Sequence, residues 1–223
     1  MPAMPLALDV PTGAVPLSQL LREGTRAEHE RAEGSRFVGE LLEGRLDVAA
    51  YADLAAQQLA VYTALEAESA VAAGEPRGAT LVFDELTRTP SIERDLAFLL
   101  GADWSEQITV HAATQRYVAH LQGAGSDVAR YAAHAYTRYL GDLSGGQIVK
   151  RMLERHYGLG PDGLAFYTFD AIAKPKPFKD LYRERLDALA LSADEAARAV
   201  DEARVAFRLN GAMFADLAAV HVS

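Results

Sequence analysis

The sequence predicts an all-α protein that folds as a single compact multi-helix domain, and three observations lead to this prediction. Proline disrupts helix interiors, yet the nine prolines leave residues 17–75, 91–160 and 178–223 without any. Within the last stretch, apolar residues recur at intervals of three and four, which is the spacing of one helix face. β-Branched residues cluster only at Thr80–Phe83 and Thr109–Val110, and no hairpin turn follows either cluster.

Three segments carry the clearest helical faces. The first is an amphipathic helix over Leu17 to Glu33. The second places Tyr51, Ala55 and Tyr62 on one face. The third is a long C-terminal helix whose apolar stripe comprises Val200, Ala203, Phe207, Asn210, Phe214 and Leu217. About eight helices are expected in all, with turns near Gly34, Gly44, Pro76, Pro90, Gly123, Gly158 and Pro175.

Length and proline distribution predict the domain organisation. A chain of 223 residues exceeds the typical domain of about 150 residues by only half, so one domain is expected. Four of the nine prolines lie in the first 16 residues, which predicts a flexible N-terminal arm over residues 1–16 and a helical domain over residues 17–223. A domain of this size is large enough to enclose a ligand cavity without covalent cross-links.

Composition excludes several classes of function. The chain contains no cysteine, which excludes disulfides, thiolate metal sites, iron–sulfur clusters and a cysteine nucleophile. The net charge of -9 disfavours a broad nucleic-acid surface. No apolar run approaches the ~20 residues that span a bilayer, and the N-terminus lacks the basic region of a signal peptide. We therefore expect a cytoplasmic protein without a membrane anchor.

Three familiar motifs fail on their context. Gly158, Gly160 and Gly163 spell G-x-G-x-x-G, but they follow a helical stretch rather than a strand. The segment Gly141–Gly146 has the glycine spacing of a phosphate-binding loop, but Gln147 stands where lysine is needed. No histidine follows a glutamate by three residues, which argues against a di-iron helical bundle.

A glycine-rich break within the helical segment Tyr136–Gln147 needs an explanation. Its glycines, Gly141, Gly145 and Gly146, together cost about 3 kcal/mol relative to alanine in a helix interior. One explanation is tight helix packing or a kink. The other is that Gly141 and Gly145, one turn apart, let the backbone approach a flat ligand closely.

Two charged residues accompany these glycines. Asp142 lies beside the face that Gly141 and Gly145 share. Arg138 precedes Asp142 by one helical turn and is placed to pair with it. An ordinary surface ion pair is the alternative interpretation for both residues.

The run YTRYLGDLSGGQ, from Tyr136 to Gln147, resembles the signature of the all-α, biliverdin-producing haem oxygenases. The resemblance continues in that family's order through LSQLLREGTRAEHERAE from Leu17, GLAFYTF from Gly163, FKDLYRERLDAL from Phe178 and AFRLNGAMF from Ala206. Together these runs lie within residues 17–217. The chain is similar to a soluble, bacterial-type member without the membrane-anchoring tail of the animal proteins.

The resemblance implies that haem is sandwiched between a proximal N-terminal helix and the kinked, glycine-rich distal helix. Haem iron needs an axial donor, and His, Met and Tyr remain when cysteine is absent. His29 matches the proximal-helix motif and is expected to be the metal ligand. Glu33, one turn later, is placed to accept a hydrogen bond from the other ring nitrogen, with a solvated helix charge as the alternative.

The resemblance also assigns a basic edge to the haem site. Residues 174–185 carry five basic and two acidic side chains, which composition alone explains equally well as a solvated face or a docking patch for an acidic partner. By the resemblance, Lys179 and Arg183 bind the haem propionates together with Tyr136 and Arg22. Vertebrate members have lysine where this chain has Arg22, and arginine keeps the charge but changes the geometry.

The C-terminal helix is expected to contribute a further part of the site. Periodicity alone would place Phe207 and Phe214 in the core. The resemblance places them along the distal wall together with Asn210. An amide on an apolar stripe needs hydrogen-bond partners, so Asn210 either joins an ordered water network or is satisfied by buried protein groups.

The reaction follows from the resemblance as well. Haem is both cofactor and substrate, and dioxygen with electrons from a ferredoxin and its reductase, or from a flavoprotein reductase, converts it to biliverdin, carbon monoxide and ferrous iron. Asp142, Gly141 and Arg138 are expected to be catalytic, and Gly141, Gly145 and Gly146 to contact the haem. The alternatives are a haem storage or transport protein, an all-α enzyme that acts on a small heterocycle, and a purely structural helical protein.

Overall fold

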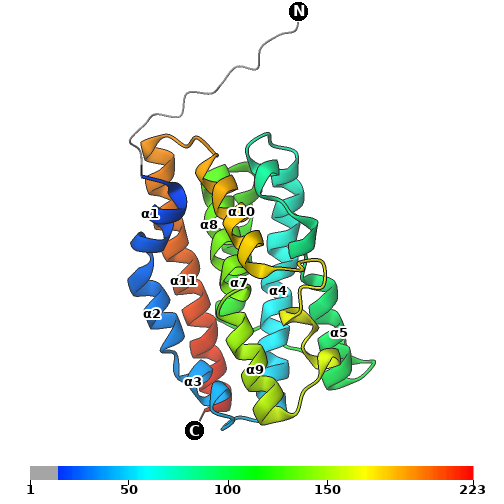
Figure 1. Cartoon of the computed structure of the whole chain (residues 1–223). Coiled ribbons are helices and arrows are strands. Elements are labelled where there is room, and N and C mark those ends of the chain that lie inside the picture. Colours follow the sequence, from blue (N-terminus) through cyan, green and yellow to red (C-terminus); the bar gives the residue numbers. More distant parts are fainter. Residues whose placement is uncertain (1–14, 223) are drawn as a thin grey trace, which may run out of the picture.

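The computed structural model describes residues 15–222, and these residues form a bundle of helices without strands (Figure 1). The α-helices are α1 (Leu17–Gly24), α2 (Arg26–Glu33), α3 (Arg36–Leu42), α4 (Val48–Ala73), α5 (Thr89–Leu100), α6 (Trp104–Gln107), α7 (Ala112–Leu121), α8 (Val128–Ala135), α9 (Gly146–Tyr157), α10 (Pro175–Asp187) and α11 (Ala193–His221). The shorter helical turns are η1 (Gly78–Leu81), η2 (Asp84–Leu86), η3 (Ala124–Ser126), η4 (Tyr136–Leu140), η5 (Pro161–Gly163) and η6 (Ala165–Tyr167). The all-α prediction is confirmed. The predicted N-terminal arm lies outside the described residues as far as residue 14.

Two long helices organise the bundle. Asp47 caps the start of α4, because its carboxylate accepts the N–H of Ala50 at 2.9 Å, and the alanine-rich sequence of α4 is apolar on most sides. A helix with this pattern is buried, and α4 packs against α5, α7 and α8. α11 begins with a capping box at Ser192 and Glu195. It runs between the N-terminal helices and the α7–α8 side of the bundle (Figure 1).

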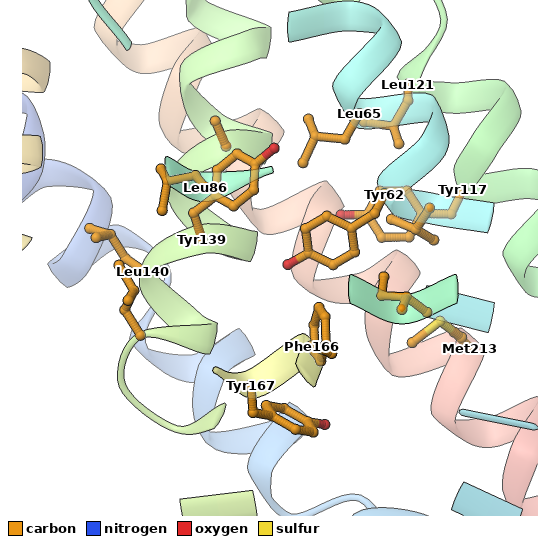
Figure 2. Packing of buried hydrophobic residues seen from close by; sticks show 14 of the residues in the cluster. Tyr62, Leu65, Leu86, Tyr117, Leu121, Tyr139, Leu140, Phe166, Tyr167 and Met213 are labelled. Carbon is orange, nitrogen blue, oxygen red and sulfur yellow. The ribbon is translucent and has the colours of Figure 1, made fainter. Parts of the chain in front are cut away.

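Aromatic side chains form part of the core beneath the glycine-rich segment. The ring of Tyr62 on α4 lies 5.3 Å from the ring of Phe166, and the ring of Phe166 lies 4.6 Å from that of Tyr167. Figure 2 shows these three rings one after another. Aromatic pairs at such distances contribute about 0.5–1.5 kcal/mol beyond their burial. The rings therefore join α4 to the segment that follows α9.

The predicted first helix is interrupted in the structure. It consists of α1 and α2, which meet at the buried residue Thr25. The hydroxyl of Thr25 donates to the carbonyl of Leu21 at 2.7 Å, a bond that bends helices. This break and short segments such as α6 raise the number of α-helices to eleven within the described residues, rather than the expected eight.

The predicted turns coincide with helix boundaries. Pro90 and Pro175 stand in the first turn of α5 and α10, where a missing backbone N–H leaves no helical bond unmade. Gly123 and Gly158 adopt left-handed conformations, with φ of 77° and 63°, next to η3 and after α9. No helix in residues 15–222 combines the length and the apolar character of a membrane span.

Candidate active site

A cavity of about 820 Å³ opens between the N-terminal helices α1 and α2 and the glycine-rich segment that follows α8, and α11 also contributes to its lining. Its volume lies within the range of about 300–1,000 Å³ that is typical of ligand and cofactor sites. Every predicted site residue lines this cavity except Lys179. The structure therefore brings the predicted residues together from four separate parts of the chain.

The glycine-rich wall of the cavity is not a regular helix. α8 passes into η4, a π-helical turn, and Gly141 and Asp142 continue as helix before the chain turns and α9 begins at Gly146. π-Helical turns are rare and occur frequently at functional sites. The predicted break thus has two parts, a widened turn before Gly141 and an interruption between Asp142 and Gly146.

Gly141 and Gly145 have no reason within the protein to be glycine. Their backbones are right-handed, with φ of -61° at both positions, so any residue could adopt them. Beyond the neighbouring backbone, a Cβ atom at Gly141 would meet no protein atom within 4 Å, and one at Gly145 would meet only the carbonyl oxygen of Gly141 at 3.7 Å. Both residues line the cavity. The missing side chains therefore leave bare backbone facing the cavity.

Gly146 has a different role from the other two glycines. It is buried, and a Cβ atom there would lie 3.2 Å from the ring of Tyr167. This approach is tighter than ordinary packing allows without a shift of the ring. Close packing therefore explains Gly146, whereas Gly141 and Gly145 leave open backbone at the cavity, and their approach to a flat ligand stays a prediction.

Asp142 and Arg138 do not form the surface ion pair that was one interpretation of their spacing. Arg138 is 6% exposed, and its guanidinium stacks over the ring of Tyr62 at 4.8 Å and donates to Oδ1 of Asn210 at 2.7 Å. The carboxylate of Asp142 accepts a hydrogen bond from the hydroxyl of Tyr62. The two charged groups are instead linked through Tyr62. The amide of Asn210 is partly satisfied by protein, because it accepts from Arg138.

Burial tunes the acidity of Asp142. It raises the pKa of Asp142 to about 6, because the charge of Arg138 and the hydrogen bond from Tyr62 offset only part of the cost of desolvation. A carboxyl group with such a pKa exchanges protons readily near neutral pH. Nε and Nη2 of Arg138 are buried without a hydrogen-bond partner, so this arginine has unused donors beside the cavity.

His29 presents an imidazole to the cavity from α2. Its side chain is 53% exposed, and Nδ1 lies 3.6 Å from Oε2 of Glu33, which is an ion-pair distance rather than a hydrogen bond. No described residue hydrogen-bonds to Nε2, which leaves this nitrogen as a possible ligand. The ring of Phe207 packs edge-on against the imidazole, with centroids 5.6 Å apart. Phe207 therefore lies on the histidine side of the cavity and not on the distal wall, because α11 contacts both sides.

Positive charge gathers at one edge of the cavity. Burial raises the pKa of Tyr136, while the nearby charges of Arg183 and Arg22 lower it, and all three side chains line the cavity. Lys179 lies close by, with Nζ donating to Oγ of Ser144 at 3.0 Å, but it does not line the cavity itself. The edge is suited to anionic groups such as carboxylates.

Sequence reasoning missed three polar or aromatic contributors to the site. Tyr62 was placed only on a helix face, and neither Gln58 nor Tyr167 was considered. Gln58 and Tyr167 line the cavity, and Tyr62 holds Asp142. The available signal was the four-residue spacing of Leu54, Gln58 and Tyr62, which puts a glutamine on an otherwise apolar face of α4.

A second group of possible metal ligands lies outside this cavity. Nε2 of His120 and Nε2 of His134 lie 2.8 and 3.0 Å from Oε1 of Glu202, and these three residues form the one compact cluster of its kind within residues 15–222. Nε of Arg130 lies 3.2 Å from the same oxygen. Because a guanidinium already neutralises Glu202, the cluster is best described as an ion-pair network that joins α7, α8 and α11.

The residues around the cavity fit a haem group. An imidazole nitrogen lacks a protein partner on one side, bare glycine backbone forms another wall, and arginines line an edge. Imidazole is a common donor to haem iron, and arginine binds carboxylates through paired hydrogen bonds. A planar tetrapyrrole with two carboxylates matches this set of contacts.

Comparisons with known proteins agree with this description. A family model described as Heme oxygenase matches residues 15–216. The proteins named Heme oxygenase 1 from Synechocystis sp. and Rattus norvegicus are each 40% identical to this chain, over 92% of it and over 85% and 72% of the two relatives. The crystal structure of heme oxygenase-1 from Synechocystis in complex with heme has a TM-score of 0.88 at 39% identity, covering 92% of this chain and 94% of that one. The structure of heme oxygenase from Leptospira interrogans has a TM-score of 0.84 at 34% identity, covering 90% and 98%. The chain belongs to the haem oxygenase family.

Proposed function

We propose that this protein is a haem oxygenase, which converts haem to biliverdin, carbon monoxide and ferrous iron with dioxygen and reducing equivalents. The observation that carries the proposal is a cavity lined both by His29 and by the bare backbone of Gly141 and Gly145. Neither backbone strain nor protein packing accounts for these two glycines. A flat ligand held close to the main chain does.

His29 is the residue that we propose would hold the haem iron. Bound haem supplies the iron at which dioxygen reacts and the porphyrin ring that is oxidised. His29 would hold the iron through Nε2, and the carboxylate of Glu33, 3.6 Å from Nδ1, helps to orient the imidazole. Phe207 contacts the imidazole edge-on and limits its rotation. With His29 on the α2 side, the glycine-rich wall would be free to face the bound haem from another side of the cavity.

The basic edge orients the haem within its plane. Arg22 and Arg183 bind the propionate carboxylates with their forked guanidinium groups, and the hydroxyl of Tyr136 joins them. Lys179, held beside Ser144, adds positive charge at the same rim. Holding both carboxylates at this edge would limit the rotation of the haem within its plane.

The glycine-rich wall and Asp142 direct the chemistry. Gly141 and Gly145 bring the backbone close to the ring and exclude bulkier groups from that face. Asp142 holds and releases a proton at its carboxylate toward the cavity through water, and a pKa of about 6 suits this role. Tyr62 holds the carboxylate in place, while Arg138 supplies a nearby positive charge. Asn210 anchors Arg138, and Phe214 closes the apolar side of the cavity.

The reducing equivalents come from a partner protein. We propose a ferredoxin with its reductase, or a flavoprotein reductase, as the donor. Lys176 and Arg185 are exposed on α10 close to the basic edge, and charges of this kind steer an acidic donor toward the haem. We further propose that the protein acts in the cytoplasm, where reducing conditions suit a chain without cysteine.

Reconstitution with hemin tests the proposal. Hemin is added anaerobically, the Soret band is recorded, and oxygen and a reductant are then admitted. A haem oxygenase binds one equivalent of hemin and then bleaches it with formation of biliverdin. Binding without bleaching would instead identify a storage or transport protein. Failure to bind hemin stoichiometrically would favour an enzyme for a small heterocycle or a structural role.

Two variants test the assigned residues. Asp142→Ala should retain haem and lose most ring cleavage, and a normal yield of biliverdin would place the proton relay elsewhere. His29→Ala should change the Soret spectrum and abolish turnover, and an unchanged spectrum would remove His29 as the ligand. His156→Ala is the matched control, because His156 is exposed and does not line the cavity.

A further inference from the structure

The loop that contains η6 is held by a buried carboxylate. Asp95 on α5 is fully buried, and its two oxygens accept the backbone N–H groups of Ala165 at 2.7 Å and Phe166 at 2.8 Å. Burying an aspartate costs free energy unless hydrogen bonds satisfy it. The loop backbone satisfies Asp95, so the two are tied together.

A buried arginine holds the same loop through its carbonyl groups. Nη1 of Arg88 donates to the carbonyl of Phe166 at 3.3 Å and to that of Thr168 at 2.9 Å, and the guanidinium lies over the ring of Phe169 at 4.1 Å. Arg88 is itself fixed, because its backbone N–H donates to Glu66 of α4. Asp95 and Arg88 therefore bind both the donors and the acceptors of one short segment.

This loop supports the glycine-rich wall from behind. The ring of Tyr167 lies against Gly146. Nε2 of Gln147 donates to the carbonyl of Tyr167 at 3.0 Å and to the carbonyl of Asp142 at 3.2 Å, so one amide joins the loop to the wall. Nζ of Lys150 adds a bond to Oγ1 of Thr168 at 2.9 Å.

The loop also reaches Asp142 by a second path. Phe166 packs edge-on against Tyr62 at 5.3 Å, and Tyr62 donates to the carboxylate of Asp142 (Figure 2 shows the rings). The wall exposes bare backbone at Gly141 and Gly145 toward the cavity. On that face it therefore has no side chains at these positions that could pack against other parts of the protein. Its position must come from contacts on the opposite side, and the loop provides them.

We propose that Asp95 and Arg88 are positioning residues for haem cleavage. By fixing the loop over residues 163–168, they set the place of the glycine-rich wall and of Asp142, and so decide which carbon of the ring is attacked. This inference rests on the proposed function. Neither residue lines the cavity, so both act through Tyr167, Gln147 and Phe166.

Asp95→Asn is the direct test. An asparagine accepts with one oxygen and turns an amide NH₂ toward the second backbone N–H, so the loop loosens. In the protein without haem, we expect amide hydrogen exchange of residues 141–149 and 163–168 to accelerate at least ten-fold. With haem, binding and the Soret band stay unchanged, whereas the ratio of biliverdin isomers shifts. A residue that served only stability would not change the isomer ratio.

Two further variants keep the test decisive. Gln147→Met cuts the link between loop and wall at a partly exposed position, and should shift the isomer ratio in the same direction even if Asp95→Asn folds poorly. Glu68→Gln is the matched control, because Glu68 also accepts two backbone N–H groups, those of Gly123 and Gly125, outside the cavity lining. It should leave the isomer ratio and the exchange of residues 141–149 unchanged.

The outcomes separate this inference from the proposed function. If Asp95→Asn and Gln147→Met both leave exchange and isomer ratio at wild-type values, the positioning role is overturned. If the control shifts the isomer ratio as much as they do, the effect is general destabilisation and the inference is again overturned. If wild-type protein does not cleave haem, the proposed function fails, while exchange in the haem-free protein still decides whether the loop holds the wall.

Discussion

Tyr62 donates its hydroxyl hydrogen bond to the carboxylate of Asp142, so a residue in the middle of α4 holds an acid in the glycine-rich wall. Tyr62→Phe removes this bond and leaves the ring packing in place. A hydrogen bond to a charged group contributes about 1.5–3 kcal/mol, so ring cleavage should slow by about 10- to 100-fold while hemin binding persists. Single-turnover bleaching measures the rate. Tyr131→Phe, which loses only a bond to Ser69, is the control, and an equal effect there would refute the specific role of Tyr62.

Gly141→Ala should make the haem-free protein more stable and a poorer enzyme. Alanine suits the right-handed backbone at this position and meets no protein atom within 4 Å, which predicts a gain of about 0.5–1 kcal/mol in the free energy of unfolding. Its methyl group enters the cavity, so hemin affinity or ring cleavage should fall. Gly146→Ala should instead lower stability, because its methyl group meets Tyr167 at 3.2 Å. Urea unfolding and hemin titration distinguish the two variants. Equal changes in their free energy of unfolding would contradict the different roles of Gly141, as open backbone, and Gly146, as a packing position.

Arg183→Gln should weaken hemin binding. Loss of a charge-assisted bond to a propionate costs about 1.5–3 kcal/mol, so the dissociation constant should rise at least ten-fold. Lys176 lies seven residues, about two turns, earlier on the same helix, and its side chain is 89% exposed. Lys176→Gln should therefore leave the dissociation constant unchanged. Comparable losses in both variants would show that the charge of α10 as a whole attracts hemin, with no specific contact from Arg183.

Stability should fall as the pH rises from about 4 to about 6 because of Asp95. Burial raises the pKa of Asp95 from 3.8 to about 6, with the backbone bonds from Phe166 and Ala165 offsetting part of this shift. The folded state therefore binds more protons than the unfolded state in this window. The protonated Asp95 contributes to the free energy of unfolding below pH 4, and this contribution is lost as the pH passes 6. Two pKa units correspond to about 3 kcal/mol. The free energy of unfolding, measured with urea across this pH range, should fall more steeply for wild type than for Asp95→Asn. Parallel pH dependences of the two proteins would show that Asp95 does not cause the fall.

Proline-free stretches and apolar spacing were sufficient to predict the helical fold. Proline and glycine also marked most helix boundaries, since each residue restricts or frees its own backbone. The break at Thr25 and the π-helical turn before Gly141 were not predicted. Both depend on how the segment packs against the rest of the bundle, and a local pattern of residue types carries no record of that packing.

The candidate site was predictable where its chemistry is unusual for a helix. Three features stand out in the sequence: three glycines in a helical segment, a histidine followed by Glu33, and a basic cluster in an acidic chain. The structure brings most of these residues to one cavity. Tyr62 and Tyr167 do not stand out, because a buried tyrosine fits a core pattern equally well. Arg138 interacts with the charge of Asp142 but forms no direct ion pair with it, and it donates instead to Asn210, a partner on another helix that spacing along one helix cannot reveal.

The π-helical turn at η4 makes the length of this segment as important as its composition. Each residue advances an α-helix by about 100°, whereas a π turn takes up its extra residue without turning the residues after it. Deleting one residue from Tyr136–Leu140 would restore an ordinary helix and keep the direction of the residues after it, whereas inserting one more residue would swing the bare backbone of Gly141 away from the cavity. An insertion that a surface loop absorbs would therefore inactivate the protein here without unfolding it.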